Sequence, residues 1–125
     1  MIKNLIYVIL GGIVGTVSRY STYLLINYLS LNSVFATLAV NLIGCFVAGL
    51  IFGLSQIFNF TENINLFLFV GILGAFTTFS TFTLDNYLLL NSNKIGFLIL
   101  NILLNNFLGL FILYLGIIIS KYIFR

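Results

Sequence analysis

The chain has 125 residues, of which 62% are hydrophobic and 6% charged, and its formal net charge is +3. Soluble domains carry roughly 25% charged residues, so the composition excludes a soluble globular protein and indicates a protein of the lipid bilayer. One cysteine, one aspartate, one glutamate and no histidine are present. That set cannot build a metal cluster or a catalytic triad, so we do not expect an enzyme. The charges form no basic patch, and we expect no nucleic-acid partner.

Long apolar segments follow one another along the whole chain. A spanning helix needs about 20 mostly apolar residues, and the segments at approximately 4–29, 34–58, 66–90 and 95–119 meet that length. The polar stretches between them are too short to hold a soluble domain. The first segment is too long for a signal peptide and no polar mature domain follows it. We therefore predict an all-α membrane protein in which residues 1–125 form a single transmembrane domain.

The charged residues near the segment ends give little information on orientation. With four spans, Lys3, Lys121 and Arg125 share one side of the membrane with Glu62, and Lys94 lies on the other. The Lys/Arg bias that normally fixes orientation is therefore weak, which permits insertion in both directions. Four thin helices cannot readily enclose a polar path and still shield it from lipid, so we expect an oligomer.

The first segment combines small residues with a charge. Gly11, Gly15 and Arg19 are spaced by four and share one helix face, and Gly49 and Gly53 repeat the small-residue spacing in the second segment. Small residues let helix backbones approach closely in lipid. An arginine at a helix centre costs about 2.5–3.5 kcal/mol on translocon scales. Arg19 therefore either extends to the nearby interface or faces an aqueous vestibule, where it would favour an anion.

Polar side chains also recur every four residues in the second and fourth segments. Thr37 and Asn41 share a face that Gly44 continues, and Asn101 and Asn105 repeat the spacing near the end of the chain. A membrane-buried amide can form an interhelical hydrogen bond, worth about 0.6 kcal/mol on average, or it can donate to a permeating anion. The spacing alone leaves both interpretations open.

The third segment contains the stretch GILGAFTTFSTF, residues 71–82. Its glycines and hydroxyls fall at the middle of the predicted span, where irregular backbone is tolerated only inside protein or along a cavity. Broken helices whose freed carbonyls coordinate an ion occur at this depth in transporters. We therefore expect the third helix to be broken near the midplane.

Phenylalanines recur every three residues in the same stretch. Phe76, Phe79 and Phe82 should lie near one another on a helix. They form either a packing stripe or a set of rings whose positive edges approach an anion. Asp85 follows near the end of the predicted span, from which it could reach the interface.

Several motifs in order carry a resemblance to a known family. GILGAFTTFSTF resembles the G-x-x-G-G-x-T-T-F-S-T-F signature of the Fluc/CrcB family of fluoride channels, with Ala75 in place of the second adjacent glycine. GGIVGTVSRY, residues 11–20, resembles the opening motif of that family. ATLAVNLIGCFVAG, residues 36–49, resembles its second-helix motif, with Ala36 in place of glycine. Together with the length and the four spans, the motifs cover most of the chain.

The resemblance implies a fluoride-selective channel that exports cytosolic fluoride passively and so relieves fluoride toxicity. It implies an antiparallel homodimer of dual topology, multi-pass in the bacterial plasma membrane, with a structural sodium ion at the dimer interface. Asn101 and Asn105 stand where a tyrosine and a serine are usual in the family. The pore or fluoride-binding residues implied are Phe79, Phe82, Asn41, Thr37, Arg19, Ser80, Asn101 and Asn105. The sodium ligands implied are the backbone carbonyls of Gly74 and Thr77.

Other kinds of membrane protein fit the length and the number of spans. A small multidrug exporter is proton-coupled and needs an acidic residue inside a helix, whereas Glu62, the sole glutamate, falls in a predicted loop. A non-transporting assembly subunit would account for the packing glycines but gives no reason for the cluster in the third segment.

Overall fold

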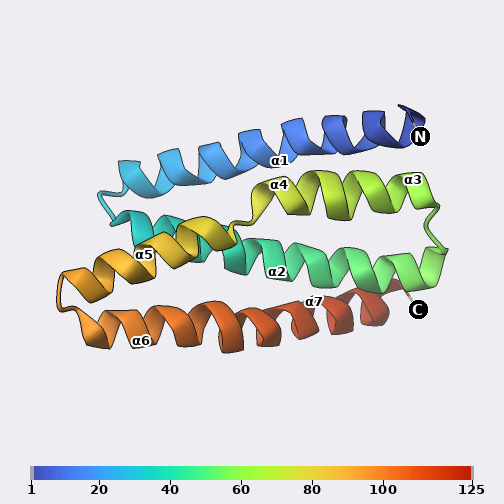
Figure 1. Cartoon of the computed structure of the whole chain (residues 1–125). Coiled ribbons are helices and arrows are strands. Elements are labelled where there is room, and N and C mark those ends of the chain that lie inside the picture. The colour runs from blue at the N-terminus through green and yellow to red at the C-terminus, as the bar shows by residue number, and fades with distance from the viewer. Residues whose placement is uncertain (1, 125) are drawn as a thin grey trace.

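The computed structural model describes residues 2–124, which fold entirely into helices and short connections (Figure 1). The helices are α1 (Ile2–Tyr28), α2 (Ser33–Phe58), α3 (Glu62–Asn65), η1 (Leu66–Leu73), α4 (Gly74–Phe76), α5 (Phe79–Asn91), α6 (Ile95–Leu103), η2 (Leu104–Leu108) and α7 (Gly109–Phe124). They compose four long segments, each long and apolar enough to cross a membrane. The expected all-α fold with four long apolar helices, one of them interrupted, is confirmed. The fourth segment extends to Phe124, beyond the predicted end near residue 119.

The interrupted third segment changes neighbours halfway along its length. η1 and α4 lie along α1, whereas α5 lies against α2 and α6 (Figure 1). α2 packs along α7 for most of its length. The two ends of the chain lie at the same end of the bundle, and the connection between α5 and α6 lies at the opposite end (Figure 1). Arg125, expected on the side of the termini, lies outside the described residues.

Glycines set the closest helix approaches. A Cβ built on Gly11 would overlap the carbonyl oxygen of Phe67, and one built on Gly49 would overlap that of Leu113. Gly116 of α7 is equally close to the backbone of α2. Because lipid provides no hydrophobic drive for helix association, such close backbone packing holds the segments together.

The break lies at Thr77 and Thr78. Thr77 has ψ of 158° and Thr78 has φ of −147°, so both leave the helical region. The Thr77 hydroxyl donates to the Leu73 carbonyl at 2.9 Å, and the Thr78 hydroxyl accepts the Thr81 N–H at 3.3 Å as the cap of α5. Threonine hydroxyls compete with helical hydrogen bonds and favour caps. The paired threonines therefore end one helix and begin the next.

Most of the outer surface of the chain is apolar, as expected for a chain surrounded by lipid. The surface beside the break is different: Gly74 and Ser80 are exposed, and Phe79 is 78% exposed. The exposed Ser80 side chain and the exposed Gly74 backbone therefore lie midway along a segment, at the depth where lipid offers no hydrogen-bond partner.

Candidate functional site

Asn41 of α2 holds the backbone of the break. Its Nδ2 donates to the Thr78 carbonyl at 3.2 Å, and its Oδ1 accepts the Thr78 N–H at 3.0 Å. Extended backbone inside a membrane segment needs such partners, because water is absent. In a continuous helix the Thr78 N–H would bond the Gly74 carbonyl four residues earlier. The bond to Asn41 leaves the Gly74 carbonyl without that donor.

A row of amide side chains extends from Asn41 across the bundle. Asn41 Nδ2 also donates to Asn105 Oδ1 at 2.9 Å. Asn105 Nδ2 donates to the Asn101 side-chain oxygen at 2.9 Å and to its carbonyl at 3.0 Å. Asn101 Nδ2 donates to Asn86 Oδ1 at 2.8 Å. The structure therefore brings together the predicted Asn41, Asn101 and Asn105, and adds Asn86. We call these four residues the amide row.

The sequence did not single out Asn86. Thr83 lies three residues before it, but the Thr83 hydroxyl bonds the Phe79 carbonyl of its own helix, and the amide that Asn86 accepts from belongs to α6. Asn106 does have polar neighbours in the sequence, but it lies outside the amide row. Its Nδ2 donates to the Ile102 carbonyl of its own helix at 2.8 Å, and its side chain is exposed. Which amide forms an interhelical hydrogen bond therefore depends on how α5 and α6 pack. The spacing of residues along the sequence gives no information on that packing.

Phe79 and Phe82 form a ring pair directly after the break. Their ring centroids are 5.7 Å apart with an interplanar angle of 45°. Phe82 is 8% exposed and faces the chain interior, whereas Phe79 is 78% exposed. Phe76 lies in α4 before the break and is 7% exposed. The expected row of three phenylalanines on one helix is therefore wrong, because the extended residues separate Phe76 from the other two.

A cavity of about 460 Å³ opens beside the break. Both predicted sodium-site residues, Gly74 and Thr77, line it together with Asn41 and Phe79. Gly44 lies at the same place, and a Cβ there would overlap the Thr77 methyl group. Within residues 2–124 no group of three or more His, Cys, Asp or Glu side chains could hold a metal. Any cation here would depend on backbone and hydroxyl oxygens.

Thr37 fastens α2 to α1. It is 1% exposed, and its hydroxyl lies 2.8 Å from the Tyr23 hydroxyl and donates to the Ser33 carbonyl at 3.4 Å. Thr37 therefore lies one turn from Asn41 without joining the amide row. Tyr23 was not singled out in the sequence, although it follows Arg19 at the same four-residue spacing.

Arg19 lines a groove of about 430 Å³ between α1 and α5. Tyr23 and Thr81 also line it, and no carboxylate does. The groove therefore presents a positive charge and hydroxyl groups together. Ser80 directly precedes Thr81 in the sequence and is exposed. Its hydroxyl lies 3.4 Å from the Thr78 hydroxyl.

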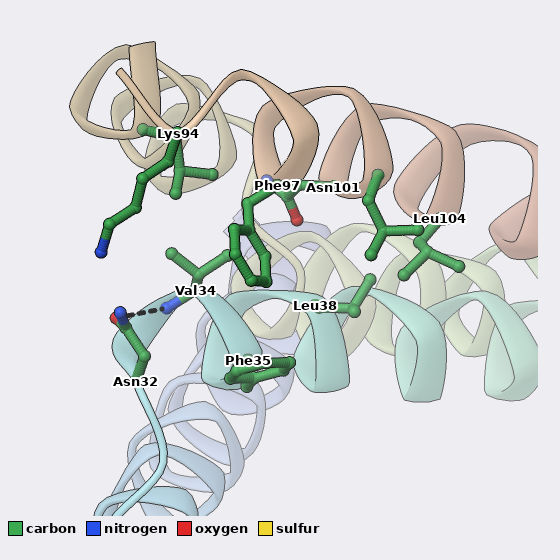
Figure 2. Close-up of a pocket in the computed structure, with 10 residues that line it drawn as sticks. Asn32, Val34, Phe35, Leu38, Lys94, Phe97, Asn101 and Leu104 are labelled. Atoms are coloured by element: carbon green, nitrogen blue, oxygen red, sulfur yellow. Dashed lines mark hydrogen bonds between the residues drawn. The ribbon is translucent and has the colours of Figure 1, made fainter. Parts of the chain in front are cut away.

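A smaller cavity of about 180 Å³ lies between the start of α2 and α6 (Figure 2). Its lining is largely apolar, with Val34, Phe97 and Leu104 among the side chains that Figure 2 shows around it. Lys94 stands at the loop end of the cavity, and Asn101 faces it from α6 (Figure 2). The cavity thus extends from the connection before α6 to one member of the amide row.

Asp85 does not reach the interface as expected. It is 4% exposed, and its Oδ2 finds no hydrogen-bond partner among residues 2–124. α5 continues to Asn91, more than a turn beyond Asp85, so this carboxyl is held inside the bundle. Buried polar groups are normally paired. The absence of a glutamate from the spans therefore does not mean that no acidic side chain is buried, because Asp85 is.

Comparison with known proteins identifies the relatives of this chain. Residues 6–117 match the model of the family described as CrcB-like protein, Camphor Resistance (CrcB). A protein of Parabacteroides distasonis named fluoride-specific ion channel FluC is 39% identical over 122 residues, 97% of this chain and 94% of the relative. A protein of the same name from Campylobacter jejuni is 42% identical over 122 residues, 97% of this chain and 100% of the relative.

The similarity is not confined to the signature motifs. Another protein named fluoride-specific ion channel FluC, from Shewanella halifaxensis, is 38% identical over 115 residues, 91% of this chain and 93% of its own length. The matched region includes most of α1, the break, the amide row and the first half of α7. The chain therefore belongs to the CrcB family.

Proposed function

We propose that this chain is the subunit of a fluoride-selective ion channel that exports cytosolic fluoride passively and relieves fluoride toxicity. The observation that carries the proposal is its identity of 39–42% over nearly its whole length to proteins named fluoride-specific ion channel FluC. Because Asp85 is buried in α5, the lack of a glutamate within a span does not by itself exclude a proton-coupled multidrug exporter. That alternative is disfavoured instead by the family to which the chain belongs.

The proposed path combines charge with neutral donors. The groove at Arg19 attracts an anion, and the hydroxyls of Tyr23 and Thr81 line the same groove. The ring edges of Phe79 and Phe82 carry positive charge that an anion can approach. Such edge contacts are weak, so N–H and O–H donors must replace most of the lost hydration. Binding must also stay weak enough for the ion to leave.

We propose that the active unit is an antiparallel homodimer of dual topology in the bacterial plasma membrane. The exposed Gly74, Phe79 and Ser80 support this proposal. The Gly74 carbonyl, which lacks its helical donor, lies midway along a membrane segment, where lipid offers no hydrogen-bond partner. A second copy packed against the break would cover these residues, and it would add a second pair of rings to each path.

The carbonyls of Gly74 and Thr77 are the proposed ligands of a structural sodium ion at that interface. Two observations support the fit: the Gly74 carbonyl lacks its helical donor, and Gly74 is exposed. The C-terminal end of α4 also points partial negative charge toward the break. A Cβ built on Gly74 would meet its nearest atom, the Phe69 carbonyl oxygen, at 3.6 Å. Any crowding from a side chain at this position would thus come from the partner copy.

The test is fluoride efflux from liposomes that contain the purified protein, followed with a fluoride electrode. The proposal predicts rapid efflux once a potassium ionophore dissipates the membrane potential, because passive anion flow needs a compensating cation. Efflux no faster than from protein-free liposomes would refute the proposed function.

A further inference from the structure

The hydrogen bonds of the amide row have a fixed direction. The Thr78 N–H is only a donor, so Asn41 must present Oδ1 to it and Nδ2 to its other partners. Asn105 must then accept through Oδ1 from Asn41. The Asn101 backbone carbonyl is only an acceptor, which independently requires Asn105 to present Nδ2 on the other side. The backbone of the break and the backbone of α6 therefore orient the row without ambiguity.

This direction determines where unused N–H groups remain. Asn41 uses both N–H groups, on Thr78 and Asn105. Asn105 uses both on Asn101. Asn101 uses one, on Asn86 Oδ1. Asn86 closes the row as an acceptor, and within residues 2–124 its own Nδ2 donates to nothing.

The unused Nδ2 of Asn86 is also reachable. The one side-chain nitrogen or oxygen of residues 2–124 that is both buried and unpartnered is Asp85 Oδ2. The unpartnered Asn86 nitrogen is therefore accessible, and the residue is half-buried. Asn86 lies four residues after Phe82 on the same face of α5, a rise of about 6 Å. The Asn86 donors thus lie about one turn beyond Phe82 toward the loop end of α5.

We infer that Asn86 is an anion-binding residue of this channel and that Asn41 and Asn105 are positioning residues. Asn86 offers the anion two neutral N–H donors while its oxygen holds the amide of Asn101. Asn41 and Asn105 have no free N–H to offer, and they fix the break and the direction of the row. The inference deepens the proposed function and rests on it.

The experiment compares fluoride efflux from liposomes for the parent, Asn86→Leu and Asn86→Asp. Leucine removes both the donors and the acceptor. Aspartate keeps an oxygen for the Asn101 N–H but offers the anion no N–H. We expect both variants to lose fluoride flux by about tenfold or more, as the loss of hydrogen bonds to a charged group predicts. The matched control is Asn106→Leu, because Asn106 is an exposed amide that bonds only its own helix. It should conduct as the parent does.

Each outcome decides a different question. A parent that does not conduct fluoride refutes the proposed function itself. A conducting parent with Asn86→Leu at the Asn106→Leu rate overturns the inference alone. Parental flux in Asn86→Asp with reduced flux in Asn86→Leu also overturns it, because Asn86 would then act only through Asn101. Gel filtration in detergent checks assembly. If the leucine variant fails to assemble, Asn86→Ser, which retains one hydroxyl donor, replaces it and should conduct more than Asn86→Asp.

Discussion

Phe76 and Phe82 are nearly equal in burial, at 7% and 8% exposure, yet they lie on opposite sides of the break. Replacing either with leucine removes similar packing. Volume-conserving apolar substitutions of this kind usually cost below about 1.5 kcal/mol. The difference between the two residues lies in their ring edges, because Phe82 pairs with Phe79 beside the proposed path and Phe76 does not. Comparing substitutions at Phe76 and Phe82 therefore separates the contribution of packing from that of anion contact.

We predict that Phe82→Leu assembles normally and conducts fluoride at about one half to one tenth of the parental rate. Leucine has no positive ring edge, and an aromatic edge contact is worth about 0.5–1.5 kcal/mol. Phe76→Leu should conduct at the parental rate. Liposome efflux, normalised to reconstituted protein, checks both variants. Equal fluoride flux in the two variants would mean that Phe82 is only a packing residue of the apolar core.

Sequence spacing predicted individual residues unevenly. It placed Asn101 and Asn105 on one helix face, and the structure hydrogen-bonds them to each other and to Asn41. It could not find Asn86, whose partner lies on another helix. It also misplaced Asp85, because burial near a helix end depends on tertiary packing rather than on distance from the segment end.

At the scale of elements, the small-residue faces determine which helices pair. α2 and α7 approach most closely at Gly49 and Gly116, where backbone meets backbone. Gly12 of α1 differs, since a Cβ built there meets nothing within 4 Å. The sequence identified the small-residue motifs and the break in the third helix. It could not say that the break would move the third segment from α1 to α6, because that depends on the direction of the extended residues.

We predict that Gly49→Ala destabilises the chain by about 1–3 kcal/mol, the usual cost of overpacking. The added methyl group overlaps the Leu113 carbonyl oxygen, so α2 and α7 must separate. Gly12→Ala should be neutral or slightly stabilising, because its Cβ has open space. Unfolding by increasing denaturing detergent, followed by circular dichroism, measures the difference. An unchanged midpoint in Gly49→Ala would contradict the close packing of these helices.

The whole molecule has an apolar exterior interrupted at the break, and a weak charge asymmetry between its ends. Asn4 Nδ2 donates to Glu62 Oε1 at 3.2 Å, so the start of α3 lies at the end that holds the termini. Glu62, expected in a loop, is the first residue of α3. Lys94 belongs to the connection between α5 and α6, and that connection lies at the other end (Figure 1). The sequence predicted this arrangement from the number of spans. Gly74, Phe79 and Ser80 are exposed in a single chain, as the proposed contact with a second copy requires.

We predict that this chain inserts in both orientations. A cysteine added after the C-terminus should react with a membrane-impermeant maleimide in part of the molecules in intact cells, and in the remainder only after the cells are opened. The weak Lys/Arg bias gives neither orientation a clear advantage. Cys45→Ser in the background removes the native thiol. Labelling from a single side of the membrane would contradict dual topology.

Selectivity between anions distinguishes a fluoride channel from a general anion pathway. Liposomes containing the purified protein are loaded with equal concentrations of fluoride and chloride, and both ions are followed with selective electrodes after the potassium ionophore is added. The account predicts rapid fluoride efflux with chloride release no faster than from protein-free liposomes. Neutral amide donors and ring edges in a narrow path favour the smaller anion. Equal efflux of the two ions would contradict a fluoride-selective channel.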